Sequence, residues 1–211
     1  TTLPAAFEAA EDGDTVMLLA DVELAETLSI GINDKWASNF VLDLNGKKIS
    51  CNNSYDATIF TSITLTICDN SEKKNGEIVD STDAEGKNSA IRAGQGATLK
   101  IIGGKFGKVS VIGGAEISGG TFSEIWAFDY SSSQIGLYTA LKDGYAFQDD
   151  NANIVNSYGT NNAKNVTVVP HTHNYNTEDK TCVCGAPCEH KNWINGVCSD
   201  CGVVCTHDSV N

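Results

Sequence analysis

The stretch ATLKIIGGKFGKVSVIGGAEISGGTFS, residues 97–123, decides the fold. Its phrase IIGGKFG at 101–107 returns as ISGGTFS at 117–123, so that Gly103 recurs as Gly119. On either side of each Gly-Gly pair the apolar residues alternate with others, and an alternation of period two indicates β-strands with one buried face. Glycine adopts positive φ angles without steric cost, so each Gly-Gly pair predicts a tight corner between two strands.

A repeat of this length is too short to bury its own apolar face and has to stack on copies of itself. The stretch therefore predicts consecutive coils of a β-solenoid. Two ordinary hairpins of a β-sandwich are the alternative, but hairpins need a sharp reversal, such as Asn-Gly, between paired strands. Because each Gly-Gly pair lies inside an apolar run, it fits a bend better than a reversal, and we favour the solenoid.

The residues before this stretch are expected to supply a capping helix and earlier coils. Residues 2–11 suit a short helix, with Thr2 as its N-cap, Pro4 in its first turn, and Leu3 and Phe7 on one face. Such a helix would cover the strand edges that an open solenoid end exposes. Further strands are expected at residues 15–19, 24–30, 40–49, 59–67, 77–79 and 165–169.

Two other segments, AAFEAAEDGDTV at 5–16 and LDLNGKKI at 42–49, carry a family resemblance together with the Gly-Gly-x-Phe repeats. They resemble the right-handed parallel β-helix domains of bacterial surface proteins, in the pectin-lyase-like superfamily. The resemblance covers residues 1–170 and rests on fold motifs that carry no chemistry. It implies an all-β fold, a single-stranded right-handed parallel β-helix with a short N-terminal capping helix, in a secreted or cell-surface bacterial protein.

Residues 126–170 look like the C-terminal cap of such a domain. Within them the apolar period changes: Ile135, Tyr138 and Leu141 would share a helical face, and Asp143-Gly144 would end the helix. This segment therefore predicts a second short helix followed by a closing strand.

The composition narrows the possible partners. The chain of 211 residues carries 14 Lys and Arg against 27 Asp and Glu, a net charge of −13. Nucleic acids and anionic membranes are polyanions, so neither is an expected partner. No apolar run reaches the roughly 18 residues of a spanning helix, so no membrane insertion is expected in this fragment. The absence of an initiator Met predicts a mature or excised piece of a longer protein.

Residues 171–211 differ sharply from the rest, because they hold most of the cysteines and all the histidines. This break in composition predicts a second domain. The tail is an internal repeat, in which His173 and Cys184 recur as His190 and Cys201. Its units resemble the zinc-ribbon-like tandem repeats at the ends of bacterial surface proteins, and the last unit is incomplete.

The repeat predicts two groups of four nitrogen and sulfur ligands. The first group in the chain is His171, His173, Cys182 and Cys184. The second is Cys188, His190, Cys198 and Cys201. Closed structural sites of this kind hold tetrahedral Zn²⁺, so we predict structural zinc that supplies the folding energy of a unit with little core. In the first group one residue separates the two thiols, and this short spacer strains chelation by both sulfurs.

Other interpretations of the tail remain open at the level of sequence. A competing register would use Cys198, Cys201, Cys205 and His207 for one site and Cys182, Cys184, Cys188 and His190 for the other. We prefer the first register because its hairpin loop is roomier. Disulfides are a further alternative for an exported chain, although they do not need the interleaved histidines. A Cys-x-x-Cys redox motif lacks its strand–helix context here.

The β-solenoid offers few candidates for catalysis. A polysaccharide lyase needs an Arg or Lys base and often Ca²⁺ held by carboxylates, and a hydrolase needs paired carboxylates. The chain has one arginine, Arg92, and the acidic residues nearest to it that could serve are Asp80, Asp83 and Glu85. A solvated acidic loop explains these residues better. We assign no catalytic residue, and keep a lyase or hydrolase as the alternative function, with Ca²⁺ only in the lyase case.

The favoured expectation is a non-catalytic module for adhesion or for binding an extracellular glycan or a surface protein. A solenoid presents a long flat face to such ligands, and exposed aromatic rings stack on sugars. Candidate rings are Trp36, Trp126 and Tyr130, with core or cap packing as the alternative role. A passive structural stalk is the third possibility, because fold alone does not determine function.

Overall fold

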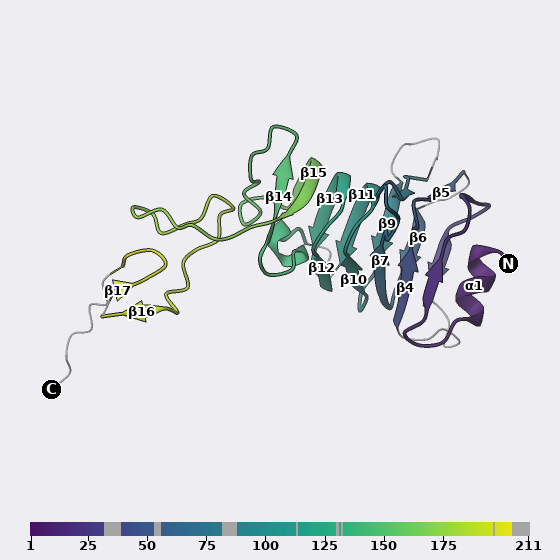
Figure 1. Ribbon diagram of the computed structural model, residues 1–211, viewed down its shortest axis with the longest axis horizontal. Coiled ribbons are helices and arrows are strands. Elements are labelled where there is room, and N and C mark those ends of the chain that lie inside the picture. Colours follow the sequence, from purple (N-terminus) through teal and green to yellow (C-terminus); the bar gives the residue numbers. More distant parts are fainter. Residues whose placement is uncertain are drawn as a thin grey trace.

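The computed structural model describes residues 1–31, 39–52, 56–81, 88–112, 114–129, 131, 133–195 and 197–203. Figure 1 shows strands stacked side by side in an elongated body, with a short helix at one end and the tail extending from the other. Within the described part of the chain, no helix is both long and apolar enough to cross a membrane.

The body contains one α-helix, one 3-10 helix and fifteen strands among the described residues, and the tail adds a small hairpin. In chain order the elements are α1 (Leu3–Ala9), β1 (Thr15–Met17), β2 (Val22–Leu24), β3 (Leu28–Ile30), β4 (Asn39–Asp43), β5 (Lys48–Cys51), β6 (Ala57–Thr61), β7 (Thr64–Cys68), β8 (Glu77–Ile78), β9 (Ser89–Ala93), β10 (Thr98–Ile101), β11 (Lys105–Ile112), β12 (Gly114–Ile117), β13 (Thr121–Phe128), η1 (Leu137–Ala140), β14 (Tyr145–Asp149), β15 (Asn162–Pro170), β16 (Trp193–Ile194) and β17 (Val197–Cys198).

The strands belong to two large sheets that the chain visits in turn. A five-stranded sheet has the order β1-β4-β7-β10-β12, and all its pairings are parallel. The strands that lie between these in the chain, for example β5 and β6 after β4, belong to a ten-stranded sheet. There too, each of these strands pairs in parallel with the equivalent strand of the next coil, as β2 does with β5, β5 with β8, and β6 with β9. The prediction of a mostly β fold with parallel sheets is confirmed.

The repeat at residues 97–123 stacks on itself in the register that its spacing predicts. Ile101 pairs with Ile117, and Phe106 pairs with Phe122, both in parallel strands. The two phenylalanine rings stack with centroids 5.3 Å apart. Parallel pairing between the two copies excludes the alternative of two antiparallel hairpins here.

Glycine is required at the corners of these coils. Gly104 and Gly120 have φ angles of 116° and 100°, which L side chains rarely adopt. At Gly119 the reason is space, because an added Cβ would lie 2.0 Å from the carbonyl oxygen of Ile102 in the coil before. The Gly-Gly phrase thus serves as a bend at which successive backbones come close together.

The N-terminal helix forms as the sequence predicts. Thr2 accepts a hydrogen bond from the backbone N–H of Ala5, and the proline lies in the first turn. Leu3 and Phe7 are buried, and the Phe7 ring meets the ring of Phe40 edge-on at 5.5 Å. The helix therefore seals the apolar interior at this end of the stack.

At the other end the parallel order stops. Strand β15 pairs antiparallel with both β13 and β14, so a hairpin covers the last parallel strand. The second helix predicted for residues 135–141 is wrong: only the four residues of η1 turn, as a 3-10 helix. Leu141 instead forms a parallel bridge with Ile117, because it continues the five-stranded sheet, and this pairing overrides the helical period.

A buried aspartate holds the corners of adjacent coils together. Asp69 is only 3% exposed, and its carboxylate accepts hydrogen bonds from the backbone N–H groups of Gly46, Ser71 and Gly76. Gly46 belongs to the coil before Asp69. Burial by itself would raise the pKa of Asp69, but these hydrogen bonds hold it below its ordinary value.

Replacing Asp69 with alanine is expected to destabilise the β body by about 3 kcal/mol, since buried backbone N–H groups lose a charged acceptor. Because the folded pKa of Asp69 lies below its unfolded value, its contribution is present above about pH 4 and is lost as the pH falls through the folded pKa. Urea unfolding at pH 7 and at pH 3 measures both effects, and the variant should differ from the parent protein less at pH 3.

The matched control for this prediction is Asp149→Ala. Asp149 accepts the same kind of turn hydrogen bonds, from Asn151 and Asn153, but it is partly exposed. Its removal should cost clearly less than that of Asp69. An equal loss in the two variants would contradict the role assigned to the buried carboxylate.

Candidate metal centres

The tail contains two groups of four side chains whose nitrogen and sulfur atoms converge. In each group the four candidate ligand atoms lie within 4.8 Å of one another. The groups are His171, His173, Cys182 and Cys184, and Cys188, His190, Cys198 and Cys201. All five cysteines are buried, and every described cysteine is a free thiol without a disulfide. The structure thus brings together the same sets of residues that the preferred sequence register combines.

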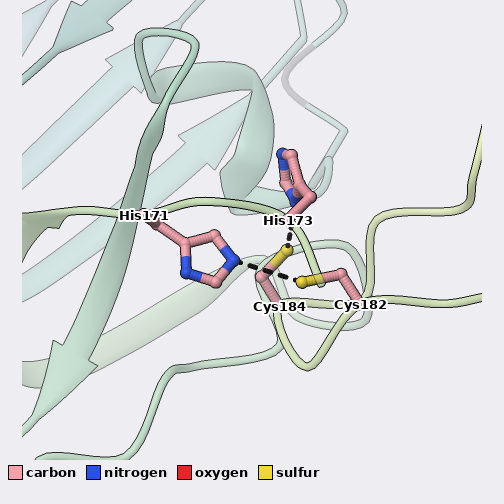
Figure 2. Close-up of side chains that lie close together, drawn as sticks. All are labelled: His171, His173, Cys182 and Cys184. Atoms are coloured by element: carbon pink, nitrogen blue, oxygen red, sulfur yellow. Dashed lines mark hydrogen bonds between the residues drawn. The ribbon is translucent and has the colours of Figure 1, made fainter. Parts of the chain in front are cut away.

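The first group is assembled where the chain leaves strand β15 and then returns. Figure 2 shows the two histidine rings approaching the two sulfur atoms. His171 Nε2 lies 3.2 Å from Cys182 Sγ, and His173 Nδ1 lies 3.4 Å from Cys184 Sγ. A turn after the cysteines fixes their direction, since the Gly185 N–H donates to the Cys182 carbonyl at 2.7 Å. Gly185 has the positive φ of 88° that this turn needs.

The second group repeats this construction with one change of ligand. His190 Nδ1 lies 3.3 Å from Cys201 Sγ, and the Gly202 N–H donates to the Cys198 carbonyl at 2.8 Å. Cys188 stands where the first group has His171, and its sulfur is 3.7 Å from that of Cys198, which is far longer than a disulfide bond. The donor sets are therefore two imidazoles with two thiols, and one imidazole with three thiols.

The short spacer between Cys182 and Cys184 does not separate their sulfurs. The residue between them, Val183, is 63% exposed, while both cysteines are buried. Both sulfurs belong to the same four-atom group. The expectation that a one-residue spacer strains the first site finds no support in this geometry.

The pKa values of the thiols and imidazoles in the two groups shift in different directions. Burial raises the pKa of Cys188 to about 11. Burial alone would also raise the pKa of Cys198, but hydrogen bonds from His190 and from backbone N–H groups lower it to about 6. Burial lowers the pKa of His171, so its neutral form, which binds metals, is favoured. Thiolate sulfur and neutral imidazole nitrogen are the donors that zinc and other soft or borderline cations prefer.

The catalytic candidates do not form one set among the described residues. Asp83 and Glu85 lie outside the described residues. Asp80 is exposed and accepts a hydrogen bond from the backbone N–H of Lys108. Arg92 instead forms an ion pair with Asp56, with Nη1 2.7 Å from the carboxylate. Sequence reasoning missed Asp56, because only the pairing of β6 with β9 brings it beside Arg92.

This ion pair lines a hollow of about 260 Å³ on the ten-stranded sheet. Lys108, Ser110 and Phe128 also line it. Both charged side chains are more than two-fifths exposed, so the pair contributes little to stability. The hollow offers hydrogen-bond donors and acceptors together with an apolar wall.

Of the aromatic candidates, Trp126 lies beside this hollow, whereas Trp36 and Tyr130 are outside the described residues. The Trp126 ring is half-buried and stacks on Phe128, with centroids 6.0 Å apart and an interplanar angle of 8°. Its indole nitrogen is buried and has no hydrogen-bond partner in the described structure. Tyr138 stacks on Tyr158 at the base of the tail, with both rings about two-fifths exposed.

The candidate functional sites of the described residues are thus the two Cys/His groups and the hollow beside Arg92. Comparison of the chain with protein-family models, with curated proteins and with solved structures finds no match.

Proposed function

We propose that this chain is a non-catalytic bacterial surface or secreted module that binds an extracellular glycan or a surface protein. In this proposal the body is a right-handed parallel β-helix and the tail holds structural zinc. The observation that carries the binding role is a row of outward side chains aligned across strands of the ten-stranded sheet. Phe60 pairs in register with Arg92, Arg92 with Ser110, and Ser110 with Trp126.

The alternation of the chain between two parallel sheets supports the β-helix. Each strand of the five-stranded sheet is followed by strands of the other sheet and then by the next strand of the first. A parallel crossover is right-handed in about 98% of cases, because a right-twisted strand packs back onto its sheet only in that direction.

The donor sets of the tail support zinc. Each group supplies four converging nitrogen and sulfur atoms, the number that a closed structural zinc site uses, whereas catalytic zinc sites keep one position open. Ca²⁺ and Mg²⁺ prefer oxygen ligands and do not suit these groups. With few buried apolar residues of their own, the two units would take their folding energy from the metal.

The hollow beside Arg92 supports a glycan as the ligand. Sugar hydroxyl groups both donate and accept hydrogen bonds, and Arg92, Asp56 and Ser110 offer both functions within one site. The flat apolar wall formed by Phe128 suits the C–H face of a sugar ring. A volume of about 260 Å³ lies below the ~300–1,000 Å³ of pockets for drug-sized ligands, so the hollow suits a single ring.

Incubating the full chain with a panel of plant, host and bacterial polysaccharides, with and without Ca²⁺, tests this function. Retention without chain shortening is the expected result. Arg92→Ala should weaken retention at least about tenfold, since it removes charged hydrogen bonds to the ligand. The control is Lys100→Ala, which breaks an ion pair of similar exposure with Glu116 on the five-stranded sheet.

Other results would point to the alternative functions. Shortened chains would contradict the non-catalytic role and favour a polysaccharide lyase or hydrolase, with Ca²⁺ dependence indicating the lyase. Absence of both retention and shortening would favour a protein-binding adhesin or a passive stalk. Equal loss of retention in the Arg92 and Lys100 variants would contradict the location of the site.

A further inference from the structure

The two Cys/His groups differ in what they contact. The first lies against the loop at residues 154–160 of the β body. The carbonyl oxygen of Cys184 accepts hydrogen bonds from the backbone N–H of Tyr158 at 3.4 Å and from Ser157 Oγ at 3.5 Å. Ile154 packs against the buried cluster formed by Cys182, Cys184 and Ala186. Thus Cys184, a predicted metal ligand, is hydrogen-bonded to the body through its backbone carbonyl.

The glycines that follow the two groups give a direct comparison. Gly185 and Gly202 occupy equivalent turns and have φ angles of 88° and 73°. An added Cβ at Gly185 would lie 2.0 Å from Asn156 Oδ1 and 3.0 Å from Tyr158 Cβ. At Gly202 the added atom would meet no atom of the described residues within 4 Å. The turn at Gly185 therefore packs against the body, whereas the turn at Gly202 has room for a side chain among the described residues.

The loop that contacts the first group is hydrogen-bonded to the body. Tyr138 N–H donates to the carbonyl of Ser157 at 3.1 Å, and Leu137 N–H donates to that of Thr160 at 2.8 Å, so the loop is tied to η1. The start of the group is tied down as well, since the His171 N–H donates to the Gly144 carbonyl at 2.8 Å. The equivalent N–H of Cys188 donates to Lys180, inside the tail.

We propose that metal binding by His171, His173, Cys182 and Cys184 closes a clasp that fixes the tail to the end of the β body, whereas the second group folds a unit that does not hold this contact. The inference rests on the proposed zinc role of the tail. His171 and His173 follow the end of strand β15, whereas Cys182 and Cys184 belong to the turn that contacts the loop at residues 154–160. Joining the four through one cation holds the turn against the loop. Docking and metal binding then favour each other, as coupled equilibria must.

Hydrogen exchange of the zinc-loaded full chain tests the clasp. The paired variants are Cys182→Ser with Cys184→Ser, and Cys198→Ser with Cys201→Ser. The first pair should speed exchange in residues 154–160, including the Tyr158 amide, by about tenfold or more. The second pair should leave this segment unchanged. Amides of β11 and β13 should stay protected in both variants, which shows that the body remains folded.

Native mass spectrometry of the same samples separates the clasp from the zinc proposal on which it rests. Two zinc ions in the parent chain and one in each variant, with unchanged exchange at 154–160 in the first variant, would overturn the clasp alone. Equal acceleration in both variants would also overturn it. Absence of bound zinc in the parent chain would overturn both proposals.

A second pair of variants keeps all eight ligands. Gly185→Ala and Gly202→Ala place the same strained residue in equivalent turns, but only the first meets the body. Gly185→Ala should speed exchange at 154–160 and weaken zinc binding by the first group. Gly202→Ala should leave both unchanged. If the two variants behave alike at 154–160, the contact does not depend on the first turn and the clasp is wrong.

Discussion

Native mass spectrometry is expected to find two zinc ions bound to each chain, and Cys201→Ser is expected to bind only one. The reason is that each group supplies four converging nitrogen and sulfur donors. Removing one thiolate from a structural site leaves the unit without most of its folding energy, which reaches about 10–16 kcal/mol in small zinc-binding peptides. We therefore expect residues 188–203 to lose protection from proteolysis in this variant, while the β body keeps its stability.

Cys51→Ala is the control for this result. Cys51 is also buried, but it lies in β5 of the body and belongs to neither group. This variant should keep both zinc ions. Disulfide-linked cysteines in the tail of the freshly isolated chain, or unchanged zinc content after Cys201→Ser, would contradict the zinc proposal.

Gly119→Ala is expected to destabilise the β body by about 3 kcal/mol or more. Its added Cβ would lie 2.0 Å from the carbonyl oxygen of Ile102. That backbone cannot move away cheaply, because the Ile102 N–H donates to the Ile67 carbonyl of the preceding coil at 2.9 Å. Overpacking at a fixed backbone lies at the upper end of the usual cost. Chemical unfolding followed by circular dichroism measures the loss.

The control for Gly119→Ala comes from the same motif. Gly103 is the equivalent residue one coil earlier, and an added Cβ there would meet its nearest atom only at 3.8 Å. Gly103→Ala should cost less than about 1 kcal/mol. If both substitutions cost the same, the close approach of Gly119 to Ile102 does not explain the loss of stability.

Repetition made much of this molecule predictable. The Gly-Gly phrase recurs at the spacing that the coils require, so its register follows from sequence alone. The cysteines and histidines recur in the same way, which is why the sequence grouped the same four side chains that converge in each unit. A repeat indicates which distant residues pair, because equivalent residues of successive copies stack in register.

Two features outside the repeats were not predicted correctly. Asp56 reaches Arg92 only through the pairing of β6 and β9, and the polar segments between these strands hide their register. The helical spacing of Ile135, Tyr138 and Leu141 misled for a related reason, since Leu141 is held by a bridge to a strand that the local sequence does not reveal. Local patterns fail where a partner distant in sequence decides the conformation.

The parallel register of the coils also gives the body a translational symmetry. A shift by one coil carries β10 onto β12 and β11 onto β13, and each such step advances the stack by one strand spacing of about 4.8 Å. Adding or deleting a whole coil would therefore change the distance between helix α1 and the tail by about one strand spacing. The number of coils therefore determines the length of the body.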